Sequence, residues 1–181
     1  MNKNFKKNKI SKNWLIKQKK DIFFNKSKIE GFRSRSAFKL IEINKKFKFL
    51  KKNTRLLDLG ASPGGWSQVA SKEITNGKIL SIDIKLIDKI TNVDFIQGDF
   101  QDHAIQQKIV AYFNNKANVV ISDMAANTTG NKNLDSYRTG ELCLNSMNLA
   151  LKILEKKGVF VSKIFMGSIF QEINEKAKKN F

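Results

Sequence analysis

The stretch LLDLGASPGGWSQ, from Leu56 to Gln68, decides the fold because a strand, a glycine turn and a helix follow one another within it. Leu56 to Gly60 has the apolar pattern of a buried strand, and we expect a helix from Trp66 onward. The turn between them lies at the carboxyl end of the strand, where α/β sheets bind ligands. Its spacing, G-x-x-x-G-G, differs from that of dinucleotide-binding turns, and no Gly-Lys-Ser/Thr follows to hold a triphosphate. By itself the turn is compatible with a nucleotide-like ligand or with no ligand.

Short apolar runs alternate with stretches long enough for helices along the rest of the chain. The expected strands are 55–59, 78–82, 93–96, 118–122 and 158–163. We expect one helix to begin at Ser34 or Ser36 and a long one to cover 134–156, where Gly158 ends it. This alternation is typical of an α/β domain with a mostly parallel sheet.

Aspartates end the two strands that follow the glycine turn, Asp83 in SIDI and Asp99 in QGDF. A carboxylate after the second strand can accept both hydroxyls of a ribose, and one after the third can bind the exocyclic amine of an adenine. Together with Gly64, where a ligand could approach the backbone, they describe an adenosine pocket without a pyrophosphate cradle. S-adenosylmethionine fits this pocket, and Asp58 and Asp123 are expected near its positive sulfonium.

The net charge of +18 is concentrated at the N-terminus. Residues 1–52 carry a net charge of +15, whereas residues 53–181 carry +3. Aromatic residues are interleaved with the first of these basic ones: Phe5, Trp14, Phe23 and Phe24. This mixture favours a nucleic-acid partner, with phosphates neutralised and bases stacked. The alternative is a solvated tail that reflects an over-use of Lys, Asn, Ile and Phe. Residues 1–30 lack a sustained period and are expected to be flexible until bound.

Several classes of protein are disfavoured by composition. The single cysteine, Cys143, and the single histidine, His103, are too few for an internal disulfide or a zinc cluster, so no metal is expected. We expect Cys143 to be a buried core thiol and His103 to begin a helix. The apolar runs are far shorter than the ~18 residues of a membrane span, and no signal peptide is evident. These features predict a cytoplasmic protein without a membrane partner.

Six stretches resemble the FtsJ/RrmJ-type (RlmE-like) ribose 2′-O-methyltransferases of large-subunit ribosomal RNA, in family order and at family-like separations. They are RSRSAFKLIEI, LLDLGASPGGWSQ, SIDI, QGDF, SDMAANTTG and VSKIF. The resemblance implies a Rossmann-like S-adenosylmethionine-dependent methyltransferase domain over 31–181, after a basic RNA-binding extension over 1–30. It implies methylation of the ribose 2′-hydroxyl of a uridine in 23S RNA, in the assembled large subunit, by a monomer.

The resemblance also implies two sets of site residues. The cofactor contacts carry over to five positions: Gly64, Trp66, Asp83, Asp99 and Asp123. Of the family's catalytic Lys-Asp-Lys-Glu set, three members fall on matching positions: Lys39, Asp123 and Lys163.

Two of these catalytic candidates also stand out without the resemblance. Lys163 ends the apolar run GVFVSK and Asp123 ends VVISD, so both are expected at the rim where the cofactor sits. A ribose hydroxyl is a poor nucleophile until its proton is being removed, and Lys163 is the predicted base or orienting group. Lys39 depends on the resemblance alone.

The chain departs from the family pattern after an expected helix over 168–178. The family continues with two further strands that carry the catalytic glutamate, and neither Glu172 nor Glu175 matches that position. We therefore expect 31–181 to be a C-terminally incomplete methyltransferase domain. A non-catalytic RNA-binding module that keeps the cofactor pocket is the alternative function. A nicotinamide enzyme is disfavoured by the glycine spacing.

Overall fold

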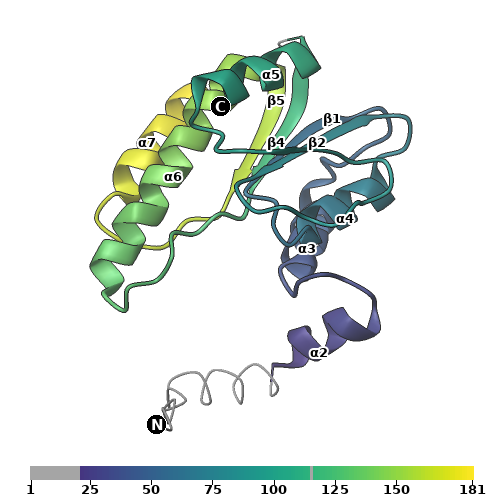
Figure 1. Cartoon of the computed structure of the whole chain (residues 1–181). Coiled ribbons are helices and arrows are strands. Elements are labelled where there is room, and N and C mark those ends of the chain that lie inside the picture. Colours follow the sequence, from purple (N-terminus) through teal and green to yellow (C-terminus); the bar gives the residue numbers. More distant parts are fainter. Residues whose placement is uncertain (1–20, 115) are drawn as a thin grey trace, which may run out of the picture.

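A three-layer α/β/α arrangement is seen in the computed structural model, which describes residues 21–114 and 116–181 (Figure 1). Its five strands are β1 Arg55–Leu59, β2 Lys78–Asp83, β3 Asp94–Gln97, β4 Ala117–Ser122 and β5 Leu154–Ser162. The helices of these residues are α2 Ile22–Ile29, α3 Ala37–Phe47, α4 Gly65–Glu73, α5 His103–Phe113, α6 Lys132–Ile153 and α7 Phe170–Asn180. All the strands are parallel, in the order β3-β2-β1-β4-β5. The predicted α/β class and parallel sheet are confirmed.

Alternating side chains of β1 build a core on each face of the sheet. Leu57 and Leu59 pack in one cluster with Ile109 of α5. Leu56 points to the other face and packs in a second cluster with Leu40 of α3. Figure 1 shows α5, α6 and α7 on one side of the sheet and α3 and α4 on the other. The period of two along one strand thus places the helices of both layers.

The strand order changes direction at β1. The chain adds β2 and β3 on one side of β1 and then returns to add β4 and β5 on the other. Leu59 is aligned with Ile82 of β2 and with Ser122 of β4, so the segments that follow these strands meet at one edge. We call this the carboxyl edge and the opposite one, where the strands begin, the amino edge. A crevice at such a reversal is where open α/β sheets bind ligands.

Regular structure begins earlier than the sequence pattern indicates. The N-terminal part of the predicted flexible segment, residues 1–20, lies outside the described residues, but Ile22–Ile29 forms α2. The Asp21 carboxylate caps this helix by accepting hydrogen bonds from the N–H groups of Phe23 and Phe24. The Phe23 ring lies 5.8 Å from that of Phe38, centroid to centroid. A side-chain cap and a tertiary contact therefore order a helix whose own apolar period is weak.

The boundary between α6 and β5 differs from the prediction. The helix expected to reach residue 156 ends at Ile153, and β5 begins at Leu154 instead of residue 158. Leu154 pairs with Ala117, and after a register shift Val159 pairs with Val119. Pairing with β4 thus overrides a local sequence that continues the helical period.

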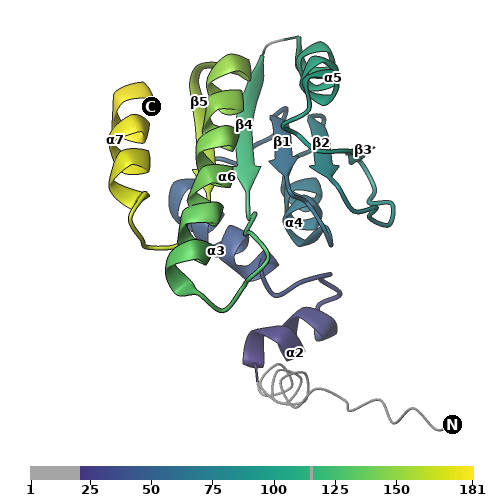
Figure 2. The same cartoon turned by 60° about the vertical axis from the view of Figure 1, so that its left-hand side comes forward.

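One face of α6 is buried against α7, while other apolar residues of α6 stay partly exposed. Tyr137 and Leu151 are 48% and 38% exposed, whereas Cys143 and Met147 pack with Ile173 of α7. The prediction that Cys143 is a core thiol is confirmed. Figure 2 shows α7 outside α6, at the β5 end of the sheet. Within residues 21–114 and 116–181, no helix combines the length and the apolar character that crossing a bilayer requires.

Candidate active site

Three carboxylates predicted from strand ends line one cavity at the carboxyl edge. Asp83 is the last residue of β2, Asp99 follows β3, and Asp123 follows β4. Their cavity has a volume of about 310 Å³ and also contacts Gly60 of the glycine turn. The sheet therefore brings together three side chains that are up to 40 residues apart in the chain, as the sequence predicts.

The two carboxylates on the β2–β3 side are held by backbone N–H groups. Asp83 accepts one hydrogen bond from Ser62 of the glycine turn and one from Lys85, each 2.8 Å long. Asp99 accepts one from Gln101 at 2.9 Å. A carboxylate has about four lone-pair positions, so each keeps acceptor capacity for a ligand. These carboxylates are fixed acceptors suited to hydroxyl or amine donors.

Lys163 and Asp123 form an ion pair beside this cavity. They follow Ser162 and Ser122, which are partners in the β4–β5 register, so parallel pairing places them next to each other. Lys163 Nζ lies 2.8 Å from Asp123 Oδ1 and also donates to the Asp123 backbone carbonyl. The side chains are 23% and 19% exposed, respectively. The pair thus holds one amine at the sheet edge, within reach of solvent.

Lys39 is not brought into this pair. It lies exposed on α3, and among the described residues no hydrogen bond or ion pair joins it to Lys163 or Asp123. Ser36, three residues earlier in the chain, contributes to a small cavity that Asp123 also lines. Lys39 therefore stays a predicted catalytic residue, on a helix whose N-terminal end reaches the site. His103 is the first residue of α5, as predicted.

The two glycines of the turn face different neighbours. Gly60 has a φ of +71°, and a Cβ there would lie 2.0 Å from Cγ of Met124, so only glycine fits against this side chain. Gly64 has a φ of +107°, and its Cβ would lie 2.8 Å from Ile90 Cδ1 and 3.0 Å from Arg33 Nη1. The structure therefore gives Gly64 a packing reason, and its predicted contact with a cofactor stays a prediction. Sequence analysis singled out Gly64 and missed Gly60.

Trp66 is buried at the start of α4. Its indole Nε1–H donates to the Ser36 backbone carbonyl at 2.9 Å, which ties α4 to the segment before α3. It lines a cavity of about 30 Å³ beside the glycine turn, together with Asp58 and Asp123. The 310 Å³ cavity does not include Trp66 in its lining. Its predicted contact with a cofactor likewise stays a prediction.

Asp58 of β1 is a buried acid beneath the glycine turn. Its Oδ2 accepts a 2.6 Å hydrogen bond from the Ser67 hydroxyl, whose oxygen lies 2.8 Å from that of Ser81. Burial, helped by the negative charges of Asp123 and Asp83, raises the pKa of Asp58 to about 7, although the Ser67 hydrogen bond opposes the shift. Asp58 lines the small cavity and is absent from the lining of the larger cavity, which includes Asp83 and Asp99.

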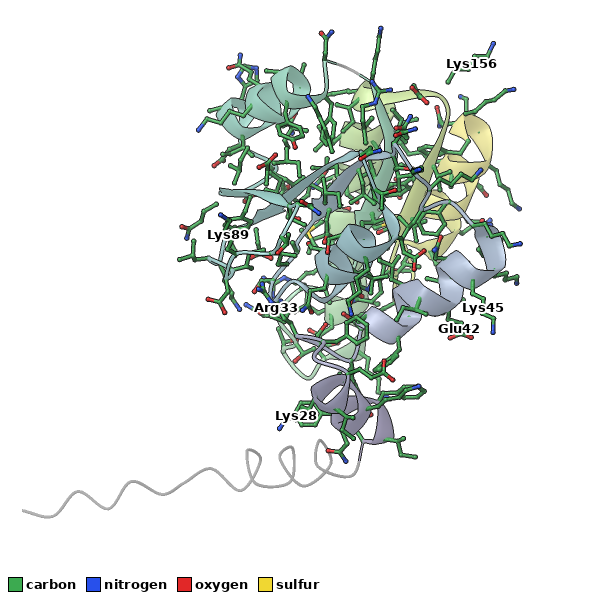
Figure 3. All side chains as sticks on the ribbon, turned by 90° about the vertical axis from the view of Figure 1, so that its right-hand side faces the viewer. Lys28, Arg33, Glu42, Lys45, Lys89 and Lys156 are labelled. Carbon is green, nitrogen blue, oxygen red and sulfur yellow. The ribbon has the colours of Figure 1, made fainter. Side chains whose placement is uncertain are left out.

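Arg33 joins the two loops that border the site, and sequence analysis gave it no role. Its guanidinium donates to the backbone carbonyls of Asp88 at 2.7 Å, Lys89 at 2.9 Å and Pro63 at 3.4 Å. Figure 3 shows Arg33 and Lys89 close together on one side of the molecule. The side chain of Gln68 in α4 accepts the Arg33 backbone N–H at 2.7 Å. Arg33 thus connects the glycine turn to the loop after β2, which begins beside Asp83.

Several known proteins are similar to this chain in sequence, and a solved structure is also similar in fold. The FtsJ-like methyltransferase family matches residues 32–181. A relative from Pelagibacter ubique, named Ribosomal RNA large subunit methyltransferase E, is 52% identical over 176 residues, which are 97% of this chain and 87% of the relative. One of the same name from Rickettsia akari is 46% identical over 186 residues, at 99% and 82% coverage. A solved structure described as a ribosomal RNA methyltransferase from Plasmodium falciparum has a TM-score of 0.75 and 32% identity, and covers 82% of this chain and 86% of that one.

Replacing Asp58 by Asn should change how stability depends on pH. Between the ordinary pKa of 3.8 and the raised value of about 7, the folded wild type binds a proton that the unfolded chain has released. Its free energy of unfolding should therefore fall across this range relative to that of Asp58→Asn, by up to about 4 kcal/mol. Urea denaturation of both proteins at several pH values measures the difference. Parallel pH profiles would contradict the assignment.

Replacing Arg33 by Ala should destabilise the protein through the loops that it joins. Three carbonyls lose a charged donor, which should lower the melting temperature by roughly 5 °C. Arg35→Ala is the matched control, because within the described residues the exposed Arg35 side chain pairs with Asp21 alone, so its loss should change the melting temperature by less than about 2 °C. Equal shifts in the two variants would show that Arg33 has no special structural role.

Proposed function

This chain belongs to the FtsJ-like methyltransferase family, and we propose that it transfers a methyl group from S-adenosylmethionine to the ribose 2′-hydroxyl of a uridine in large-subunit ribosomal RNA. The relatives' names support ribosomal RNA as the substrate. The single observation that carries the choice of a hydroxyl acceptor is the Lys163–Asp123 pair beside the carboxylate-lined cavity.

The donor set of the carboxyl-edge cavity suits S-adenosylmethionine. Asp83 offers carboxylate oxygens to the two ribose hydroxyls, and Asp99 offers one to the adenine amine. Gly60 of the glycine turn lines the same cavity beside them. A volume of about 310 Å³ is at the lower end of the range for small-molecule sites. The bound cofactor would supply an activated methyl group, with Gly64, Trp66 and Asp123 as its further proposed contacts.

Lys163 is the proposed group that orients the hydroxyl or, as the neutral amine, receives its proton. Asp123 holds the Lys163 amine through its carboxylate and its backbone carbonyl, so the amine has one defined position at the cavity edge. A proton acceptor must lie within hydrogen-bond reach of the hydroxyl it serves. Lys39, exposed on α3, is the proposed third member and would contact the RNA side of the reaction.

Residues 1–30, the first part of the basic N-terminal stretch, are the proposed RNA-binding extension. Residues 1–52 carry a net charge of +15, and within the described part Lys26 and Lys28 lie on α2 beside aromatic rings. Such segments neutralise phosphates. We further propose that the enzyme is a cytoplasmic monomer that acts on the assembled large subunit, with 31–181 as its methyltransferase domain.

The proposed function is tested with radiolabelled S-adenosylmethionine and large ribosomal subunits that lack the modification. Labelled 2′-O-methyluridine in the digested RNA is the expected product. Cofactor binding without transfer would instead favour a non-catalytic RNA-binding module. Label on a base would contradict the choice of a hydroxyl acceptor.

Lys163→Ala should abolish methyl transfer while cofactor binding persists. Loss of the group that receives or orients the hydroxyl proton should lower kcat by at least about 100-fold, and Kd for S-adenosylmethionine should stay within about threefold. Lys108→Ala, at an exposed position of α5, is the control and should keep the wild-type kcat. Single-turnover kinetics and calorimetry measure the two quantities. A near-normal rate in Lys163→Ala would overturn the assignment.

Asp83→Asn should weaken S-adenosylmethionine binding. The amide keeps one acceptor oxygen but loses the charge and one of the two acceptors, so Kd should rise between about tenfold and about 100-fold. Asp88→Asn is the matched control. Asp88 is an exposed acid in the loop after β2, and it contacts Arg33 through its backbone carbonyl and not through its side chain. Equal Kd values for both variants would remove Asp83 from the cofactor site.

A further inference from the structure

A second cavity lies at the amino edge of the sheet, opposite the candidate active site. Its volume is about 360 Å³, and it shares no lining residue with the carboxyl-edge cavity. The loop between α3 and β1 and the first residues of β4 and β5 form its walls. Five of its lining residues matter here: Phe47, Lys48, Lys51, Lys52 and Lys157. We call it the amino-edge cavity.

The amino-edge cavity is strongly basic. Its four lysines are exposed. The one acid in its lining, Glu155, lies 2.8 Å from Arg55 and accepts a hydrogen bond from Asn118, so its charge is already compensated. Figure 3 shows Lys45 of α3 and Lys156 of β5 projecting outward on the same side of the molecule. The two edges of the sheet therefore differ in sign, with three carboxylates and Lys85 around one cavity and four lysines and the paired Glu155 around the other.

The loop that carries these lysines has a defined conformation. Asn44 Oδ1 accepts the Leu50 N–H at 3.0 Å, and Thr54 Oγ1 accepts the Lys51 N–H at 3.1 Å. The Asn53 N–H donates to the Thr75 carbonyl at 2.9 Å. Because the backbone is already ordered, binding an anion here would cost little loop entropy.

An aromatic ring stands at the wall of this cavity. Phe47 is 64% exposed, and the ammonium of Lys46 lies 5.2 Å from its ring centroid. An exposed ring among lysines is the pattern with which proteins bind single-stranded nucleic acid, since the ring stacks on a base and the lysines neutralise phosphates.

We propose that the amino-edge cavity binds a single-stranded segment of RNA, with a base stacked on Phe47 and phosphates held by Lys51, Lys52 and Lys157. The identity of this RNA as part of the methylated substrate rests on the proposed function. The six residues of β4 separate the two edges by about 20 Å. The bound nucleotides therefore lie several positions away from the methylated one, and a long or folded RNA can contact both edges.

The first test compares two triple variants with the same change of charge. Lys51, Lys52 and Lys157 are changed to Gln in one, and Lys108, Lys178 and Lys179, which are exposed on α5 and α7, in the other. Binding of a short single-stranded RNA oligonucleotide is measured by fluorescence anisotropy from about 50 to about 200 mM salt. The amino-edge variant should reduce the salt slope by about two and the matched variant by much less.

Equal slopes for the two triple variants would overturn the proposal, because they would show that only total charge matters. Phe47→Ala should weaken oligonucleotide binding by about tenfold. An oligonucleotide carrying 4-thiouridine should crosslink to the peptide around Phe47. Crosslinks confined to the carboxyl edge would also overturn it.

A further assay separates this proposal from the proposed function. Large subunits lacking the modification are methylated by wild type and by both triple variants. The amino-edge variant should raise KM for subunits at an unchanged kcat. Absence of methylation by the wild type would contradict the proposed function, while the binding and crosslinking results would still decide the RNA site.

Discussion

The pairing of β1 with β2 on one side and β4 on the other is the constraint on which the rest of this structure depends. It aligns Leu59 with Ile82 and with Ser122, so the glycine turn leaves the sheet between Asp83 and Asp123. Alternation along the same strand places Leu56 and Leu57 in different cores. One five-residue strand therefore sets the two helical layers and the ligand-binding edge together.

The glycine turn is held from below and from outside by two side chains that do not line the carboxyl-edge cavity. Asp58 binds the Ser67 hydroxyl beneath it, and Arg33 binds the Pro63 carbonyl outside it. Gly64 is required where Arg33 and Ile90 approach the backbone. Gly60 is required where Met124 approaches the backbone at the wall of the carboxyl-edge cavity. Gly60 and Gly64 of the same turn thus pack against different neighbours.

Much of the fold follows from short-range sequence patterns. The predictions that failed did so because of contacts between residues distant in the chain. The strands at 55–59 and 118–122 appear close to their predicted bounds, because a buried strand is apolar throughout. The predicted end of α6 at residue 156 was wrong. The helix ends at Ile153 because pairing of Leu154 with Ala117 outweighs helical propensity. The roles of Arg33 were missed because its carbonyl partners lie 30 to 56 residues away and backbone carbonyls leave no trace in a sequence.

The sequence by itself determined the α/β class, the family resemblance and the positions of Asp83, Asp99, Asp123 and Lys163 at strand ends, because these depend on residue type and local period. Only the tertiary structure decided which of these side chains meet. Parallel register joins Lys163 to Asp123 and leaves Lys39 exposed on α3. The opposite charges of the two sheet edges likewise arise from packing, since loops distant in the chain come together only when the strands align.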